Sequence, residues 1–328
     1  YLEHFGWTPT KFTDKGNAIV DESVLKGITD IPECVMIAEY FLISKREAML
    51  RNILGKVGED TRIHGYVNTN GASTGRMTHS DPNMAQIPAV HKDKQGNILW
   101  GIEGGYGADF RNLFIAKPGY SVVGCDASGL ELRMLAHYMN DNAYTKEILD
   151  GDIHTANQIA AGLSERSQAK TFIYGYLYGA GDAKIGEIVN GTSRDGKRLK
   201  EKFLKNTPAL KILRERVIIA AKRGYVKGLD GRKLWIRSEH SALNFLLQGA
   251  GAIVMKQALV FLVETTKHLD YKLVLNCHDE FQAEVLDEHT EEFEELAIES
   301  IVNAGKHFEM RCPLDAEAAT GSSWCYTH

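Results

Sequence analysis

The chain has 328 residues, of which 44% are hydrophobic and 25% are charged, and its formal net charge is -5. This length exceeds one ordinary core and predicts two or three subdomains, and the composition excludes a disordered chain. The longest apolar run, GAIVMKQALVFLV, is interrupted by Lys256 and is too short to predict a membrane span. Five cysteines form no CxxC pair, and their odd number argues against a disulfide framework and favours a reducing cytoplasm.

Charge is distributed unevenly along the chain. Residues 165–240 carry 18 Lys or Arg against 8 Asp or Glu, a local net charge of +10, which leaves -15 on the rest. Such asymmetry is typical of a protein that binds nucleic acid or phosphate. The alternative is a basic face that is only solvated.

The first half of the chain is predicted to be helix, then loop, then strand. Residues 1–60 are expected to be helical, with a long apolar helix that ends at Gly55. Residues 61–119 are rich in Gly, Asn, Pro and Ser and predict short strands and ordered loops. The run YSVVGCD predicts a buried strand, and SGLELRMLAHYM predicts the helix after it.

The second half is predicted to be helices interrupted by two hairpins. Residues 152–223 are mostly helical, and GYVKGLDGRKLWIRS predicts the first hairpin. A long helix over SALNFLLQGAGAIVMKQALVFLVETTKHL follows, weakened at Gly249 and Gly251. The second hairpin is YKLVLNCHDEFQAEV, with inward apolar residues expected at alternate positions: Leu273, Leu275, Cys277, Phe281, Ala283 and Val285. An acidic helix and a tail end the chain.

The segment RSQAKTFIYGYLYGAG predicts a helix with one polar stripe. Arg166, Lys170, Tyr174 and Tyr178 recur every four residues and form a slanting row about 18 Å long. Two cations followed by two aromatic rings match a nucleoside triphosphate laid along the helix, with its phosphates at the N-terminal end. The alternative is a solvated face on which Arg and Lys cover the tyrosines.

Acidic residues follow two of the predicted strands. Asp126 ends the buried run, and Asp279 with Glu280 is expected at the tip of the second hairpin. A carboxylate at the end of a buried strand must be solvated, paired or metal-bound, because burying it bare is costly. Two such acids could hold two divalent ions about 3.5 to 4 Å apart for phosphoryl transfer. Each acid alone also fits an ordinary surface residue, and the basic region favours the metal site.

A second stripe with four-residue spacing lies at the start of the long helix. His240, Asn244 and Gln248 could donate to minor-groove acceptors, which occupy similar places in every base pair. Such contacts test base-pair geometry without reading sequence. The alternative is a polar helix edge.

These segments resemble a known enzyme family. DASGLELRMLAHY, RSQAKTFIYGYLYG and VLNCHDEFQAEV resemble motifs A, B and C of family A DNA polymerases, in that order. TGRMTHSDPNMAQIP, GDIHTANQIA and ALNFLLQGAGAIVMK resemble further family segments. The sequences of these motifs are most similar to those of the replicative family members from short-tailed bacteriophages. The resemblance covers nearly the whole chain.

The resemblance implies an α+β fold shaped as a polymerase right hand, with an antiparallel palm sheet, helical fingers and a partial helical thumb. It divides the chain into a partial thumb at 1–60, a first part of the palm at 61–135, fingers at 136–240 and a second part of the palm at 241–328. It also implies that no exonuclease domain lies in this chain.

The activity implied is DNA-directed DNA polymerisation, in which a nucleotidyl group passes from a dNTP to a primer 3′-hydroxyl and pyrophosphate leaves. Two Mg²⁺ ions would be held by Asp126, Asp279 and the carbonyl of Ala127. Glu280 would support the metal site or the primer end, and Lys170 would neutralise developing charge. These four side chains are the expected catalytic residues: Asp126, Asp279, Glu280 and Lys170.

The resemblance also implies two sets of binding residues. The nucleotide would be bound by Arg166, Lys170, Tyr174, His154, Glu131 and Tyr178, and primer-template DNA by Arg76, Gln86, His240, Asn244, Gln248 and His278. Glu131 would crowd the site of a 2′-hydroxyl. The Tyr174 hydroxyl would replace the contact that a dideoxynucleotide lacks, and so predicts tolerance of dideoxynucleotides.

Two alternative functions stay open. The related single-subunit RNA polymerases share the acids and the Lys-Tyr-Gly helix, whereas a noncatalytic DNA clamp would keep only the basic region. The expected partners are primer-template DNA, dNTPs and, through a region upstream of Tyr1, a processivity factor or other replisome protein, but no membrane. The expected location is the cytoplasm, that of a bacterial host if the chain is phage-encoded.

Overall fold

The computed structural model describes residues 2–9, 12–13, 15–236 and 238–327. The chain forms two compact units. The first comprises Tyr1–Tyr66, His79–Ile115 and Ser323–Cys325, and the second comprises Val67–Thr78, Ala116–Ser322 and Tyr326–His328. The division into thumb, palm and fingers stays a prediction.

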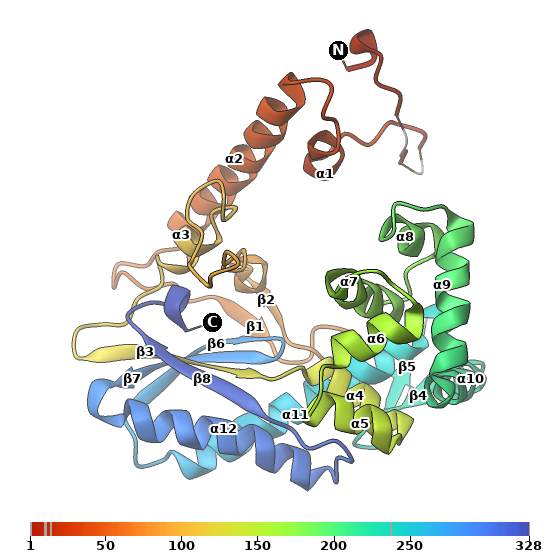
Figure 1. Ribbon diagram of the computed structural model, residues 1–328. Helices are drawn as coiled ribbons and strands as arrows, with labels where there is room; N and C mark the ends of the chain where they lie inside the picture. The colour runs from red at the N-terminus through yellow and green to blue at the C-terminus, as the bar shows by residue number, and fades with distance from the viewer. Residues whose placement is uncertain (1, 10–11, 14, 237, 328) are drawn as a thin grey trace. The chain divides into compact units, whose positions relative to one another are not determined.

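The first unit is built on short helices and one long helix. Its elements are the 3-10 helices Leu2–Phe5 and Met84–Gln86 and the α-helices α1 (Glu22–Lys26), α2 (Glu33–Leu54) and α3 (Gly107–Arg111). Helix α2 (Figure 1) ends at Gly55, as its periodicity predicts. Helices α1 and α2 share a small buried core of Leu25, Ile28, Ile31, Cys34 and Ala38. The expectation that residues 1–60 are helical holds for these helices only.

An antiparallel sheet forms the base of the second unit. Its strand order is β6-β7-β3-β8, and the bounds are β3 Tyr120–Ala127, β6 Tyr271–Cys277, β7 Glu280–Leu286 and β8 Ala316–Gly321. Helix α12 (Thr290–His307) packs along one face of this sheet (Figure 1). The predicted strand β3 and the second hairpin strand β7 are therefore the two central strands of the sheet, and the first hairpin strand β6 lies at its edge.

Strand β6 departs from the predicted alternation. Leu275 is buried, but Leu273 and its neighbour Val274 are exposed. A break in the register between Leu273 and Leu275 leaves one extra residue on this edge strand, and such a bulge shifts the facing of the side chains before it. After the turn, Phe281, Ala283 and Val285 are fully buried, as expected.

Strand β8 is absent from the sequence-based prediction, which gave the last residues as a tail. It pairs antiparallel with β3, with Ala127 opposite Ala316. Its sequence, AEAATG, has little β-branched or aromatic character. Pairing with a buried neighbour therefore decides its conformation.

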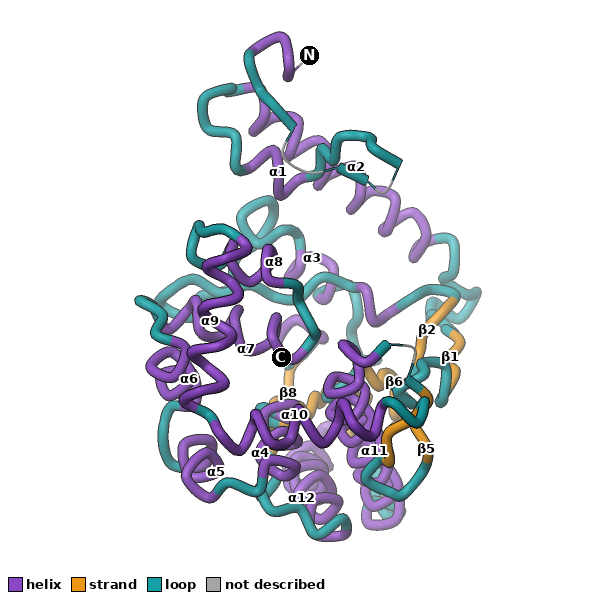
Figure 2. Tube along the Cα trace, turned by 90° about the vertical axis from the view of Figure 1, so that its right-hand side faces the viewer, coloured by secondary structure: helices purple, strands orange, loops and turns teal. Residues whose placement is uncertain are grey.

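Seven helices follow β3 and form the helical part of the second unit (Figure 2). They are α4 (Leu130–Met139), α5 (Asn142–Leu149), α6 (Ile153–Ala161), α7 (Arg166–Leu177), α8 (Asp182–Glu187), α9 (Ser193–Asn206) and α10 (Pro208–Ala221). Asp141 and Asp152 cap α5 and α6 by accepting from backbone N–H groups of the first turn. Helix α7 buries Phe172, Ile173 and Leu177 in the main core.

Two small strand pairs and a long helix remain, and the second pair and the helix belong to the second unit. Strands β1 (Tyr66–Asn68) and β2 (Thr78–Ser80) form one pair, and β4 (Tyr225–Lys227) and β5 (Lys233–Trp235) form the predicted first hairpin. Arg237, the last cation of the predicted basic region, lies outside the described residues. Helix α11 runs over Ala242–Thr265 after a 3-10 turn at Glu239–Ser241.

The glycines of α11 mark close packing. A Cβ atom at Gly249 would lie 2.7 Å from Cδ1 of Leu234, and one at Gly251 would lie 3.2 Å from Cδ2 of Leu130. Both glycines therefore let β5 and α4 approach the helix closely.

The same helix passes a test of length and apolar composition for a membrane span over Glu239–Thr265, which corrects the expectation that the run is too short. In its most apolar window, 61% of the residues are buried inside the protein. Leu246, Val254 and Leu262 belong to the main core. Packing therefore accounts for the apolar character of this helix.

Candidate active site

The two predicted metal-binding acids come from β3 and from the turn that leads into its neighbour β7. Asp126 lies opposite Glu280 in the β3–β7 register. The backbone N–H of Ala127 donates to the carbonyl oxygen of Asp279 at 2.9 Å. Because β3 and β7 are hydrogen-bonded neighbours, Asp126 and Asp279 emerge at the same end of the sheet.

The turn between β6 and β7 is shorter than the sequence suggests. His278 and Asp279 form it, and His278 adopts a left-handed backbone with φ 61°. Glu280, expected at the tip, is instead the first residue of β7 and is buried. The amide Nε2 of Gln282 donates to its Oε1 at 2.6 Å. The prediction of Glu280 as a tip residue is therefore wrong, because strand pairing begins one residue earlier.

A pocket of about 360 Å³ opens beside the two acids. It is lined by residues of β3, α4, α7, α11, the β6–β7 turn and the segments before β2 and after α7. Among them are Arg76, Asp126, Glu131, Tyr174, Tyr178 and Asp279. Acidic, basic and aromatic groups from distant parts of the sequence therefore share one cavity. Such convergence is typical of ligand sites.

Glu131 holds the centre of a polar cluster in this pocket. The Tyr178 hydroxyl donates to Glu131 Oε2 at 2.7 Å, and Arg76 Nη2 lies 4.0 Å from Oε1. Burial raises the pKa of Glu131, and the Tyr178 hydrogen bond and the Arg76 charge oppose that rise. Burial and the hydrogen bond to Glu131 raise the pKa of Tyr178. Tyr178, and not Tyr174, the predicted partner of Glu131, makes this hydrogen bond.

Helix α7 presents the predicted stripe. Arg166 and Lys170 are exposed, Tyr174 is half-buried and Tyr178 is exposed. Tyr178 is the residue after the last helical turn rather than part of the helix, and its ring stacks on Tyr174 with centroids 6.4 Å apart. Burial, reinforced by the charges of nearby acids, raises the pKa of Tyr174.

The helix stops at a glycine for a steric reason. Gly179 has φ 76°, and a Cβ atom there would lie 3.0 Å from the carbonyl oxygen of His240. A side chain at this position would be both strained and crowded. The glycine that was predicted to end α7 therefore also allows the end of this helix to pack closely against the turn before α11.

Arg166 is engaged by an acid that the sequence did not single out. Its Nε and Nη2 donate to Asp152 at 2.6 and 3.0 Å. This fork lowers the pKa of Asp152 and raises that of Arg166. Desolvation, together with the Arg166 and Lys170 charges, lowers the pKa of His154. His154 lies beside the cations, and its uncharged form is favoured more than in a free imidazole, although the Asp152 charge opposes this effect.

Comparison with known proteins decides the family. A sequence profile of DNA polymerase family A matches residues 1–326. The chain belongs to DNA polymerase family A. It is 44% identical over 370 aligned residues to the DNA-directed DNA polymerases of Escherichia phage T7 and Enterobacteria phage T3, over 100% of this chain and 51% of each relative. This family A chain thus spans about half the length of these relatives.

A solved structure shares the fold. The chain is 24% identical to the "POL domain of Pol1 from M. smegmatis complex with DNA primer-template and dNTP", with a TM-score of 0.83 over 97% of this chain and 58% of that one. The predicted α+β fold of a family A polymerase is confirmed.

The predicted DNA-binding residues of this family A chain fall in several places. Asn244 and Gln248 are half-buried on α11, whereas His240 lies in the preceding 3-10 turn and is exposed. The expectation that all three share one helix is therefore wrong for His240. Gln86 is exposed in the first unit, and Arg76 and His278 belong to the second.

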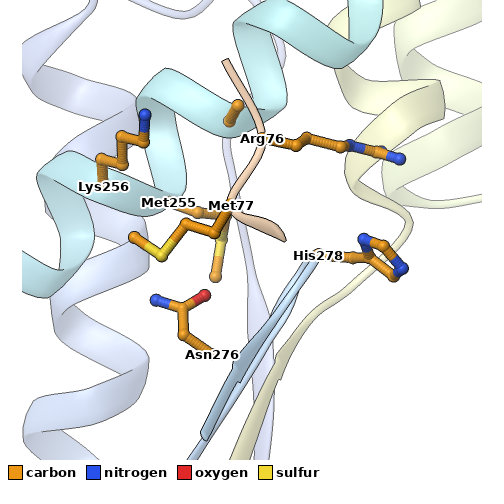
Figure 3. Close-up of a pocket in the computed structure, with 7 residues that line it drawn as sticks. Arg76, Met77, Met255, Lys256, Asn276 and His278 are labelled. Atoms are coloured by element: carbon orange, nitrogen blue, oxygen red, sulfur yellow. The ribbon is translucent and has the colours of Figure 1, made fainter. Parts of the chain in front are cut away.

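A smaller pocket lies next to the first and shares Arg76 and His278 with it. In Figure 3 the side chains of Arg76 and His278 point to the same side, whereas Lys256 points away from them. Burial lowers the pKa of Lys256, and the Arg232 charge adds to this effect. In the sequence Lys256 only interrupts an apolar run. A cation within such a run is nevertheless a signal of a polar environment, and here it lines the smaller pocket.

The oxygen donors near Asp126 bear on the metal that the family resemblance implies. Within the part of the chain that the structure describes, no three His, Cys, Asp or Glu side chains converge as a metal site. Asp126 and Asp279 nevertheless line one pocket beside the backbone of Ala127. Because Mg²⁺ is usually held by one or two carboxylates together with substrate phosphates, this set of oxygen donors fits Mg²⁺ bound with a nucleotide.

Proposed function

We propose that this chain is the polymerase portion of an enzyme that carries out template-directed DNA synthesis. The primer 3′-hydroxyl attacks the α-phosphorus of a dNTP, a new phosphodiester bond forms, and pyrophosphate leaves. One observation carries the proposal: Asp126 of β3 and Asp279 of the β6–β7 turn line a single pocket with Tyr174 and Glu131. Membership of DNA polymerase family A supports it.

The acids and the cations have complementary roles. Asp126, Asp279 and the Ala127 carbonyl would hold two Mg²⁺ ions, which would lower the pKa of the attacking hydroxyl and neutralise the triphosphate. Lys170 stabilises the charge that develops on the leaving phosphates and can protonate them. Glu280 orients groups at the metal site or at the primer end.

The outer phosphates are bound by Arg166 and His154. Arg166 exchanges Asp152 for a phosphate oxygen, since both present the planar pair of acceptors that a guanidinium prefers. His154, whose uncharged form is favoured in the free protein, becomes protonated beside the polyphosphate. Arg166 is the first residue of α7, and His154 lies on α6. The phosphates are thus expected at the N-terminal end of the α7 stripe.

Glu131 and Tyr178 set the shape of the sugar and template sites. Their hydrogen bond closes one side of the pocket. Glu131 then crowds the position of a ribose 2′-hydroxyl, which favours dNTPs over rNTPs. Tyr178 occupies the template position until a nucleotide binds.

DNA is bound by residues around the two pockets and by Gln86 of the first unit. Arg76, Asn244, Gln248 and His240 donate to minor-groove acceptors, and His278 contacts the primer backbone. The cations of α9 and α10 contact phosphates, so affinity for DNA falls steeply with salt. Primer-template DNA and dNTPs are thus the proposed partners, in the cytoplasm of a bacterial cell.

A primer-extension experiment tests the proposal. A labelled primer on a DNA template is incubated with the chain and either dNTPs or rNTPs, with and without Mg²⁺. We expect extension with dNTPs and Mg²⁺ only. Extension with rNTPs at the same efficiency would identify an RNA polymerase, and DNA binding without any extension would identify a noncatalytic clamp.

Tyr174→Phe tests the sugar site. The Tyr174 hydroxyl is proposed to replace the contact that a missing 3′-hydroxyl would make, and a hydrogen bond to a charged partner contributes about 1.5 to 3 kcal/mol. We therefore expect the ddNTP-to-dNTP ratio of kcat/KM to fall by at least about tenfold. Single-nucleotide incorporation assays measure both values. An unchanged ratio excludes this role of the hydroxyl, and Tyr176→Phe, on the buried face of α7, is the matched control.

A further inference from the structure

A buried polar network lies behind the acidic end of the sheet. Glu280, Gln282 and Thr327 are only 5%, 1% and 5% exposed. Glu280 and Gln282 project from the same face of β7, because they are two residues apart on one strand. In Figure 1 the C-terminal end of the chain lies on the side of the sheet opposite α12. The network thus lies on the face of the sheet opposite α12, and it is buried there.

Thr327 fixes the orientation of the Gln282 amide. The Thr327 hydroxyl donates to Gln282 Oε1 at 2.7 Å, and Gln282 Nε2 lies 3.5 Å from the Thr327 carbonyl oxygen. A carbonyl oxygen can only accept, so both contacts select the same orientation of the amide. The remaining N–H of Nε2 then points to Glu280 Oε1, at 2.6 Å.

The neighbouring strand leaves room for this network. Gly124 of β3 is the partner of Gln282 in the register. A Cβ atom at Gly124 would lie 2.4 Å from both Gln282 Nε2 and the Thr327 carbonyl oxygen. Even an alanine would therefore displace the Gln282–Thr327 pair, because real Cβ contacts do not approach this distance.

We propose that Gln282 is a positioning residue for Glu280, and that Thr327 near the C-terminus holds it in the competent orientation. Glu280 lies opposite Asp126 in the register and directly after Asp279 in the chain. The carboxylate at this place must keep one orientation if it is to support the reacting groups. Gln282 and Thr327 act through Glu280 and touch neither DNA nor nucleotide. This inference rests on the proposed function.

Thr327→Val tests the network with little change in volume. Without the hydroxyl, the Gln282 amide can rotate and its donor leaves Glu280. We expect kcat for single-nucleotide incorporation to fall about tenfold, while the KM for dNTP and the Kd for primer-template DNA stay within about twofold. Thr327→Ser keeps the hydroxyl and should restore kcat. Gln282→Met removes the amide and should lower kcat at least as far.

Two further measurements separate this role from a loss of stability. Ser300→Ala removes another buried hydroxyl, one that donates to the Ala297 carbonyl within α12, and should leave kcat unchanged. The side-chain amide protons of Gln282, followed by NMR, should exchange slowly with solvent in the wild-type chain and faster in Thr327→Val. This second measurement does not depend on activity.

The outcomes distinguish the inference from the proposed function. A wild-type chain that fails to extend primers refutes the function, and the exchange of the Gln282 amide still tests the network. If the wild-type chain extends primers but Thr327→Val matches it in kcat, or Thr327→Ser does not restore kcat, the positioning role is wrong. Unchanged amide exchange in Thr327→Val overturns it as well.

Discussion

Replacing Asp126 with Asn should lower the rate of primer extension by at least about 10³-fold, equivalent to about 4 kcal/mol of transition-state stabilisation. Asn keeps the size of the side chain and removes its charge. Asp126 lies at the end of β3 next to Asp279, where two negative charges can attract the cations that phosphoryl transfer requires. Single-turnover incorporation of one dNTP measures the loss.

Binding of primer-template DNA should survive this substitution, with Kd within about threefold, because phosphate contacts elsewhere supply most of the affinity. Asp270→Asn is a matched control. Asp270 lies just before β6, accepts a hydrogen bond from Tyr120 at 2.6 Å, and lines neither pocket. If Asp126→Asn loses DNA binding and thermal stability together with activity, Asp126 has a structural role rather than a catalytic one.

Lys170→Ala should lower the maximal rate of incorporation by about 10² to 10³-fold, the range found when one preorganised donor to a developing negative charge is removed. Lys170 is exposed on α7, four residues from Arg166 and four from Tyr174. Its charge lies where the stripe predicts the phosphates of the nucleotide. Rapid-quench measurements over a range of dNTP concentrations separate the maximal rate from the affinity for dNTP.

Lys146→Ala, on the exposed face of α5 and outside both pockets, is the matched control and should change the maximal rate by less than about twofold. Lys170→Arg keeps the charge and should recover part of the rate. An equal loss in Lys146→Ala would assign the effect to net charge. A loss confined to dNTP affinity would make Lys170 a binding residue only.

The sequence predicted best where local chemistry and packing agree. Helix α7 follows from its four-residue spacing and its glycine stop, and the buried run before Asp126 follows from continuous apolar residues. The turn between β6 and β7 was placed within one residue. In each case the pattern of apolar residues, periodic or continuous, identifies the element, and a polar or flexible residue marks its end.

The rest depends on contacts between residues far apart in the chain. Strand β8 forms because β3 offers an edge, and its own sequence carries no strand signal. Asp152 was unremarkable until the fold set it beside Arg166. The link from Thr327 to Glu280 joins residues whose spacing follows no period. No window of sequence contains such information.

The ion pair between Arg166 and Asp152 has a consequence for how a nucleotide would be received. Both side chains are about half-exposed, at 57% and 42%, so solvent screens their attraction and the pair is weak. An incoming polyphosphate can displace Asp152 with little opposition. The long side chain of Arg166 is meanwhile kept extended instead of sampling many rotamers. Asp152 thus holds the guanidinium weakly in the free protein, so that a phosphate group can replace it as the partner of Arg166.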